Sequence, residues 1–121
     1  MNTKEKRFSH HIKHNEFFKS RLIDVGARKD CTGFYFVVYI LDLLINKNII
    51  TKSYSKNIYP LVAKKFNKHI SCVERDIRTL IDKSWSDNMK TSLNKVRQFE
   101  NKPTCRKFIS AMHDYIIAEI S

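Results

Sequence analysis

The stretch YPLVAKKFNKHISCVERDIRTLIDKSW, Tyr59–Trp85, contains two helical patterns separated by a short polar turn. Apolar residues recur in each half at intervals of three and four, which places them on one face of a helix. Pro60 must lie in the first turn of its helix, because deeper inside it would remove a hydrogen bond and clash with the preceding turn. We predict one helix that ends near Phe66 and a second over residues 71–85. Their inward faces would consist of Ile58, Leu61, Val62 and Phe66, and of Val73, Ile77, Leu80, Ile81 and Trp85.

The second of these helices carries a start signal. Ser71 precedes Glu74 by three residues, a spacing at which each side chain can bond the other's backbone N–H. Arg75 and Arg78 follow one turn apart, on the side away from the apolar stripe. A helix, a turn of about four residues and a capped helix with a basic outer face form the layout of a helix-turn-helix, here over about residues 56–85.

The rest of the chain also follows helical patterns. Only two glycines and two prolines occur, and the Asn-Gly and Asp-Gly pairs typical of β-hairpins are missing. Gly26 is well placed to end one helix, and an apolar run predicts a buried helix over about residues 33–46. We therefore predict an all-α, single compact domain of about five to six helices over residues 16–121, preceded by a basic N-terminal arm over residues 1–15.

The charge of the chain is one-sided. Lys and Arg number 23 against 12 Asp and Glu, which gives a net charge of +11. Such an excess favours polyanions, because each Lys or Arg that meets a phosphate releases condensed counterions. Double-stranded DNA is the expected partner, with a membrane surface or an acidic protein as alternatives. The most apolar run, residues 33–45, contains Asp42 and is too short to span a bilayer, so it predicts a buried helix and no membrane span.

No residues indicate an enzyme, a metal site or a cofactor. The motifs G-x-x-x-x-G-K-[ST], G-x-S-x-G and H-E-x-x-H do not occur. Cys31, Cys72 and Cys105 are widely spaced, so neither a zinc site nor a disulfide framework is expected. The three histidines of segment 10–14 have no acidic or thiol partner at a useful spacing, so we expect them to be solvated. No secretory leader opens the sequence, so a cytoplasmic, nucleoid-associated location is expected.

Several elements of Tyr59–Trp85 occur together: Tyr-Pro at the start of the first helix, the run Ala-Lys-Lys-Phe-Asn, Val-Glu-Arg, the Ile-Arg that follows, and the terminal Trp. With these elements the chain resembles the DNA-binding effector domain of the sporulation initiation regulators, the stage zero sporulation protein A family. Gly26, Gly33 and an aromatic-rich helix extend the resemblance backwards, and "KPT" at residues 102–104 extends it forwards. It covers about residues 17–120.

The resemblance implies a six-helix, all-α domain that binds short DNA boxes in promoters, often as tandem copies, and contacts an RNA polymerase sigma factor. By position, Glu74 and Arg75 would read bases, and Arg78 would approach the DNA backbone or a base edge. The family usually has arginine where this chain has Cys72 and histidine where it has Thr79, so its usual target box is not expected to carry over. The predicted base-reading residues are Cys72, Glu74, Arg75 and Arg78, and the predicted backbone contacts are Lys64, Lys65, Lys68, Ser71 and Thr79.

Three functions are compatible with these features. The first is a standalone transcription regulator that inserts the helix at 71–85 into the major groove. The second is a protein-interaction module that binds the full-length regulator or the sigma factor and antagonises it, and the third is a non-specific architectural DNA binder. Retention of Glu74 and Arg75 favours the first. Full-length members of the family begin with a phosphoacceptor receiver domain, for which these residues leave no room, so we expect DNA binding to be independent of phosphorylation.

Overall fold

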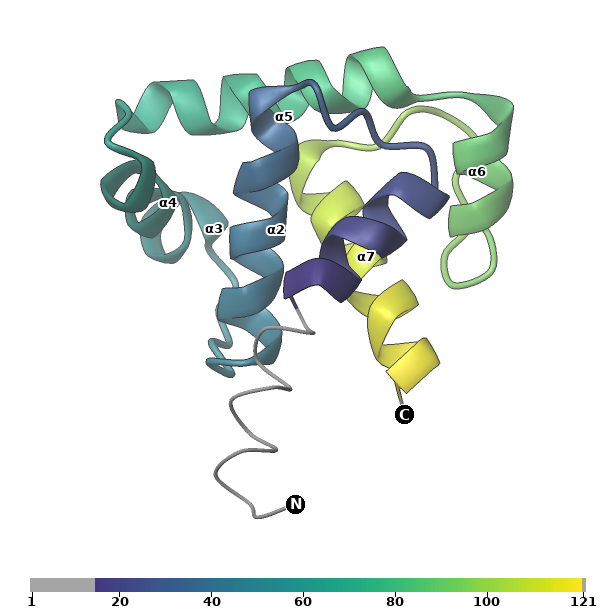
Figure 1. Ribbon diagram of the computed structural model, residues 1–121, viewed down its shortest axis with the longest axis horizontal. Coiled ribbons are helices and arrows are strands. Elements are labelled where there is room, and N and C mark those ends of the chain that lie inside the picture. The colour runs from purple at the N-terminus through teal and green to yellow at the C-terminus, as the bar shows by residue number, and fades with distance from the viewer. Residues whose placement is uncertain (1–14, 121) are drawn as a thin grey trace.

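The centre of the fold is the apolar helix α2 (Thr32–Ile45), as Figure 1 shows for the computed structural model, which describes residues 15–120. Apolar residues occur all around this helix rather than along one stripe, so it is buried on most of its sides. The helix predicted over about residues 33–46 is thereby confirmed to within one residue. The predicted arm falls almost wholly on residues 1–14, which lie outside the described residues.

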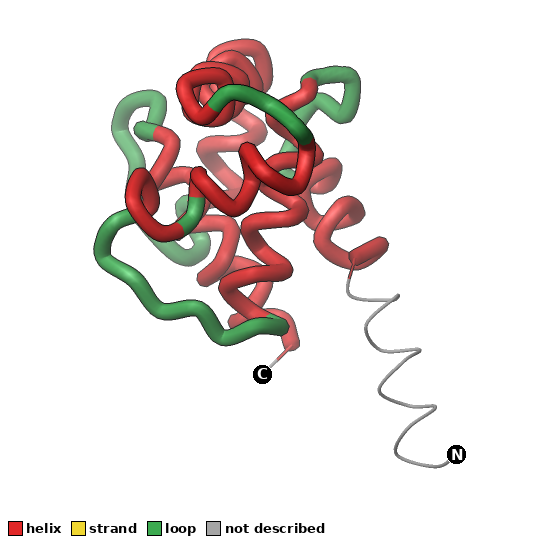
Figure 2. Tube along the Cα trace, turned by 90° about the vertical axis from the view of Figure 1, so that its left-hand side faces the viewer, coloured by secondary structure: helices red, strands yellow, loops and turns green. Residues whose placement is uncertain are grey.

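The other elements surround α2. Residues 15–24 are helical, and α3 (Tyr54–Asn57), α4 (Tyr59–Phe66), α5 (Ile70–Ser84), α6 (Asp87–Leu93) and α7 (Cys105–Ile120) follow in the chain. The long helix α5 lies across one end of α2, while α4 and α7 contact α2 on different sides (Figure 1). Residues 15–120 form helices joined by loops, without a β-strand (Figure 2). The predicted all-α, single compact domain is confirmed.

The helices α2 and α5 approach each other closely where they cross, at Gly33. A Cβ atom built on Gly33 would lie 2.7 Å from the carbonyl carbon of Asp76 and 2.9 Å from the Cα of Ile77. Both neighbours are backbone atoms of α5, which cannot rotate away as a side chain can. Only glycine therefore lets the two helices pack at this separation.

Gly26 ends the helical segment 15–24, as the sequence predicts. Its φ of +100° lies in the left-handed region, which glycine adopts at little cost. The N–H of Gly26 donates to the carbonyl of Ile23, and the N–H of Ala27 donates to that of Leu22, both at 2.9 Å. The following linker is fixed to α5 by one further bond, from the N–H of Arg28 to Oγ of Ser84 at 3.0 Å.

The predicted helix before the turn is in fact two helices. Ser53 caps the short α3, and α4 starts anew after Ile58 without a side-chain cap; Pro60 lies in its first turn, as predicted. The prediction that Leu61 faces inward is wrong, because its side chain is 38% exposed. The buried face of α4 is centred on Tyr59 and Val62, and consecutive residues on a helix are turned by about 100°, which carries Leu61 to the edge of this face.

The predicted capping box of α5 is also wrong. The helix begins one residue earlier, at Ile70, and the acceptor at its start is Nδ1 of His69, which receives the N–H of Ser71 at 3.2 Å. Glu74 does not reach back to the start of the helix, since its carboxylate pairs with Arg78 one turn further on. His69 accepts the backbone N–H of Ser71, and Arg78 pairs with the carboxylate of Glu74. In a capping box this N–H and this carboxylate would bond to each other.

Aromatic pairs pack in the regions next to the two ends of α5. The ring of Phe66, at the end of α4, packs 5.0 Å from that of Phe36 on α2. At the other end of α5, Trp85 meets Phe99 edge to face, with ring centroids 6.4 Å apart. The first contact joins α4 to α2 just before the turn that leads into α5, and the second fixes the C-terminal end of α5 to the loop after α6. No helix within residues 15–120 has the length and apolar character needed to cross a membrane.

Candidate nucleic-acid interface

The outer face of α5 is the surface to which the sequence assigned base reading. The opposite face, formed by Val73, Ile77, Leu80 and Ile81, is buried to 99% or more. Because this stripe is fixed against the core, the polar side chains between its members must point to solvent. The helix, the turn at residues 67–69 and α4 together have the order and turn length of a helix-turn-helix. Asn67 makes the turn in a left-handed conformation, with φ of 53°.

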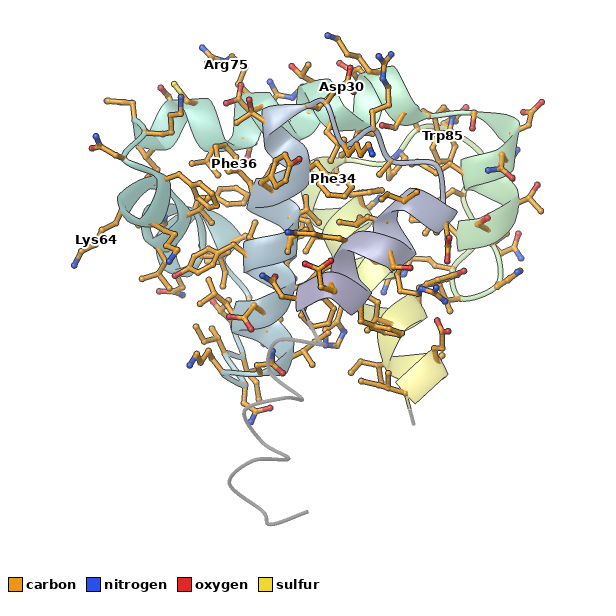
Figure 3. The ribbon with its side chains drawn as sticks, in the orientation of Figure 1. Asp30, Phe34, Phe36, Lys64, Arg75 and Trp85 are labelled. Atoms are coloured by element: carbon orange, nitrogen blue, oxygen red, sulfur yellow. The ribbon has the colours of Figure 1, made fainter. Side chains whose placement is uncertain are left out.

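Arg75 is the most accessible of the predicted base-reading side chains that form ion pairs. Its side chain is 65% exposed and points away from the body of the protein in Figure 3. Its ion-pair partner among the described residues is Asp76, with Nε 3.5 Å from the carboxylate. An exposed pair of this kind is weak. The guanidinium is therefore free to make two parallel hydrogen bonds to a guanine edge.

Glu74 and Arg78 form one unit. The Glu74 carboxylate accepts a hydrogen bond of 2.7 Å from the Arg78 guanidinium across one turn of α5, and both side chains are about half exposed. The pairing turns Arg78 toward Glu74 and engages one of the two carboxylate oxygens. A carboxylate in this position can accept a hydrogen bond from cytosine N4, while the arginine supplies charge to a base edge or a phosphate.

The remaining predicted contacts on α5 lie beside this unit. Cys72 is partly buried, and Ser71 is exposed at the first turn of the helix with its hydroxyl 2.8 Å from Nδ1 of His69. The hydroxyl of Thr79 donates to the carbonyl of Arg75 at 3.0 Å. Thr79 therefore keeps only acceptor capacity, which suits a phosphate poorly.

The lysines of α4 and of the turn lie apart from Arg75. Lys64 points sideways from α4 in Figure 3, whereas Arg75 points upwards from α5. Nζ of Lys65 lies 5.7 Å from the ring of Tyr39, so this lysine is directed toward α2. Lys68 is exposed in the turn. The α5 residues thus share one face, and the predicted lysines flank it at one end.

Sequence reasoning missed the segment that leads into α7. Lys102 lies close to α5, with its Nζ 2.6 Å from the Asp82 carboxylate, and the thiol of Cys105 donates to the carbonyl of Glu74 at 3.5 Å. Twenty or more residues separate these partners in the chain, so helical periodicity could not connect them. The "KPT" run at residues 102–104 was the available signal.

Burial of Cys105 predicts a loss of stability at alkaline pH. Chiefly because the thiolate would be desolvated, the pKa of Cys105 is raised from 9.0 to about 11. The unfolded chain loses this proton first, so the free energy of unfolding should fall by about 1–3 kcal/mol as the pH rises from about 9 to about 11. Urea unfolding at pH 8 and pH 11 checks this, with Cys105→Val as the matched variant that cannot titrate. Equal losses in the two proteins would contradict the assignment.

Within residues 15–120, no group of three or more His, Cys, Asp or Glu side chains is placed to hold a metal ion. The histidine cluster His10, His11 and His14 lies outside the described residues. The cysteines Cys31, Cys72 and Cys105 are free thiols.

A helix packed through a short turn on a second helix, with exposed arginine on its outer face, is typical of helical DNA-binding domains. Residues 19–116 match the family described as "Sporulation initiation factor Spo0A C terminal". The match covers most of the 121 residues, so the chain belongs to this family of DNA-binding effector domains, which is a regulatory and not an enzymatic class.

Proposed function

We propose that the protein is a sequence-specific transcription regulator that inserts α5 into the major groove of promoter DNA. The observation that carries the proposal is the 65% exposed side chain of Arg75, which stands opposite a fully buried apolar stripe on the same helix. The major groove admits an α-helix, and the side chains near its N-terminal end reach base edges. Membership of a DNA-binding effector family supports the same function.

In this proposal Arg75 makes a bidentate contact to guanine, and the Glu74–Arg78 unit reads or flanks a neighbouring base pair. Cys72 is shorter than the arginine usual in the family and offers only a weak donor, so the box it faces should differ from the family's. Lys64, Lys65, Lys68 and Ser71 would contact the DNA backbone, whereas Thr79 would do so only if its hydroxyl gave up its bond to the carbonyl of Arg75. Because the α5 face is already exposed, no phosphoryl group is needed to uncover it, and treatment with acetyl phosphate should leave the affinity unchanged.

Selection of bound sequences from a random pool of duplexes tests the proposal. A common box should emerge, and a gel shift with excess random competitor should retain the complex on this box. Two copies on adjacent boxes would show as a second shifted band, which is the expected sign of tandem binding. Contact with an RNA polymerase sigma factor is a further part of the proposal, to be measured once the box is known. Absence of any selected box would favour the non-specific or the protein-interaction function instead.

Lys64→Ala should weaken binding to every duplex alike. Lys64 points outward from α4, which places its charge within reach of phosphates and not of base edges. Loss of one phosphate contact should reduce the slope of log affinity against log salt by about one. Fluorescence anisotropy on the selected box and on a random duplex measures both slopes. Lys47→Ala is the control, because Lys47 lies just beyond the end of α2 that is far from α5 (Figure 1), and a loss confined to the selected box would contradict a backbone role for Lys64.

A further inference from the structure

A groove of about 630 Å³ lies between the outer face of α5, the segment before and within α3, and the start of α7. It combines residues from three parts of the chain that are far apart in sequence. Its charged lining consists of Lys52, Glu74, Arg78, Asp82, Lys102 and Arg106. None of Lys52, Lys102 and Arg106 belongs to the DNA contacts assigned above.

The charges in this groove do not cancel. Arg78 pairs with Glu74 at 2.7 Å, and Lys102 pairs with Asp82 at 2.6 Å, so two of the four cations are compensated. Among the described residues, neither Lys52 nor Arg106 forms an ion pair. The groove therefore carries an excess of two positive charges.

The other groups around Arg106 leave this excess unchanged. The guanidinium of Arg106 lies over the ring of Tyr54, 5.3 Å from its centroid, and both residues line the groove. Burial raises the pKa values of Tyr54 and of Cys105, so neither contributes a negative charge at neutral pH. The groove also ends at the first turn of α7, where the N–H groups of Cys105 and Arg106 have no acceptor within the helix, while that of Lys107 donates to Oγ1 of Thr104. All of these features favour an anion with several acceptor oxygens.

We infer that this α5–α7 groove is a phosphate-binding site, held chiefly by Lys52 and Arg106. Arg78 lines the groove and also lies on the outer face of α5, one turn from Arg75. A duplex read by Arg75 would thus run past the groove, and its backbone is one source of the phosphate. This source rests on the proposed function, whereas a free phosphorylated molecule would use the same chemistry.

The salt dependence of DNA binding tests whether the DNA backbone supplies the phosphate. Each lost phosphate contact lowers the slope of log affinity against log salt by about 0.9. Between 50 and 200 mM salt, the affinity of the wild type should therefore fall about 3.5-fold more than the affinity of Arg106→Ala. Lys52→Ala should reduce the salt slope by the same amount on the selected and on the random duplex. Lys107→Ala is the matched control, because Lys107 is exposed on the same helix but does not line the groove. Circular dichroism melting confirms that each variant is folded.

Titration with inorganic phosphate at constant ionic strength tests the groove without DNA. Backbone amide signals of Cys105 and Arg106 should shift in NMR spectra of the wild type and of Lys107→Ala, and shift much less in Lys52→Ala. A reduced salt slope supports the DNA backbone as the source; shifts with phosphate but an unchanged slope support a free phosphate. An unchanged slope together with absent shifts overturns the inference. If the wild type binds no duplex at all, the proposed function fails. The phosphate titration alone then decides whether the groove binds phosphate.

Discussion

Gly33→Ala should lower the free energy of unfolding by about 3 kcal/mol, at the upper end of the usual cost of overpacking a core. The added Cβ would stand 2.7 Å from the carbonyl carbon of Asp76 and 2.9 Å from the Cα of Ile77. These atoms belong to the backbone of α5, so relief requires α2 and α5 to move apart. Such a movement would loosen the buried stripe of α5 along its whole length.

Urea denaturation followed by circular dichroism measures this loss. Thr32→Ala is the control, since Thr32 precedes Gly33 in the first turn of α2 but is exposed, and its replacement should change stability by less than about 0.5 kcal/mol. A Gly33→Ala protein as stable as the wild type would show that α2 and α5 do not need this close approach. Because α5 carries the proposed base readers, the variant should also bind the selected box more weakly than its fraction of folded protein predicts.

Arg75→Ala should cost about 1–3 kcal/mol of binding to the selected box, which corresponds to about a 5- to 150-fold loss of affinity. The reason is geometric: the exposed guanidinium offers two parallel donors that match the acceptors of guanine. On random duplexes the loss should be much smaller, because there the side chain supplies only charge. Arg75→Lys is the sharpest control, since it keeps the charge and removes the fork. We expect it to restore binding to random DNA and not to the selected box.

This prediction is tested at a single salt concentration. The affinities for the selected and the random duplex are measured for the wild type, Arg75→Ala and Arg75→Lys. If Arg75→Ala weakens both duplexes equally, α5 does not read bases through Arg75. The protein-interaction function would then be the better explanation of the exposed basic face. Full recovery of the selected box by Arg75→Lys would mean that charge alone, and not bidentate bonding, fixes the sequence preference.

Local rules determined much of the fold. Helical spacing assigned Val73, Ile77, Leu80 and Ile81 to the core, and the same geometry placed Arg75 on the opposite face, because a residue's direction on a helix follows from its position alone. Gly26 ended its helix because glycine adopts the left-handed region at little cost, and Pro60 occupied a first turn because proline lacks the N–H that a later position needs. The family resemblance was equally visible in the sequence.

Local rules failed where a residue had two alternative interactions of similar free energy. Glu74 could bond the start of its helix or pair with Arg78, and the structure has the ion pair, while His69 supplies the cap. Leu61 has the right spacing for the core, yet α4 turns Tyr59 inward in its place. The free energies of such alternatives differ by about 1 kcal/mol. The packing of the whole helix therefore decides between them.

Only the tertiary structure decided the role of Gly33 and the existence of the α5–α7 groove. Periodicity gives Gly33 no role within its apolar run, although the family resemblance includes it. Its necessity comes from the backbone of residues 76–77, more than forty positions later. Lys52, Arg78 and Arg106 belong to three separate segments, and no periodicity relates them. Periodicity reports which side chains share one helix, whereas a crossing distance or a groove depends on how several helices are placed by the burial of a common core.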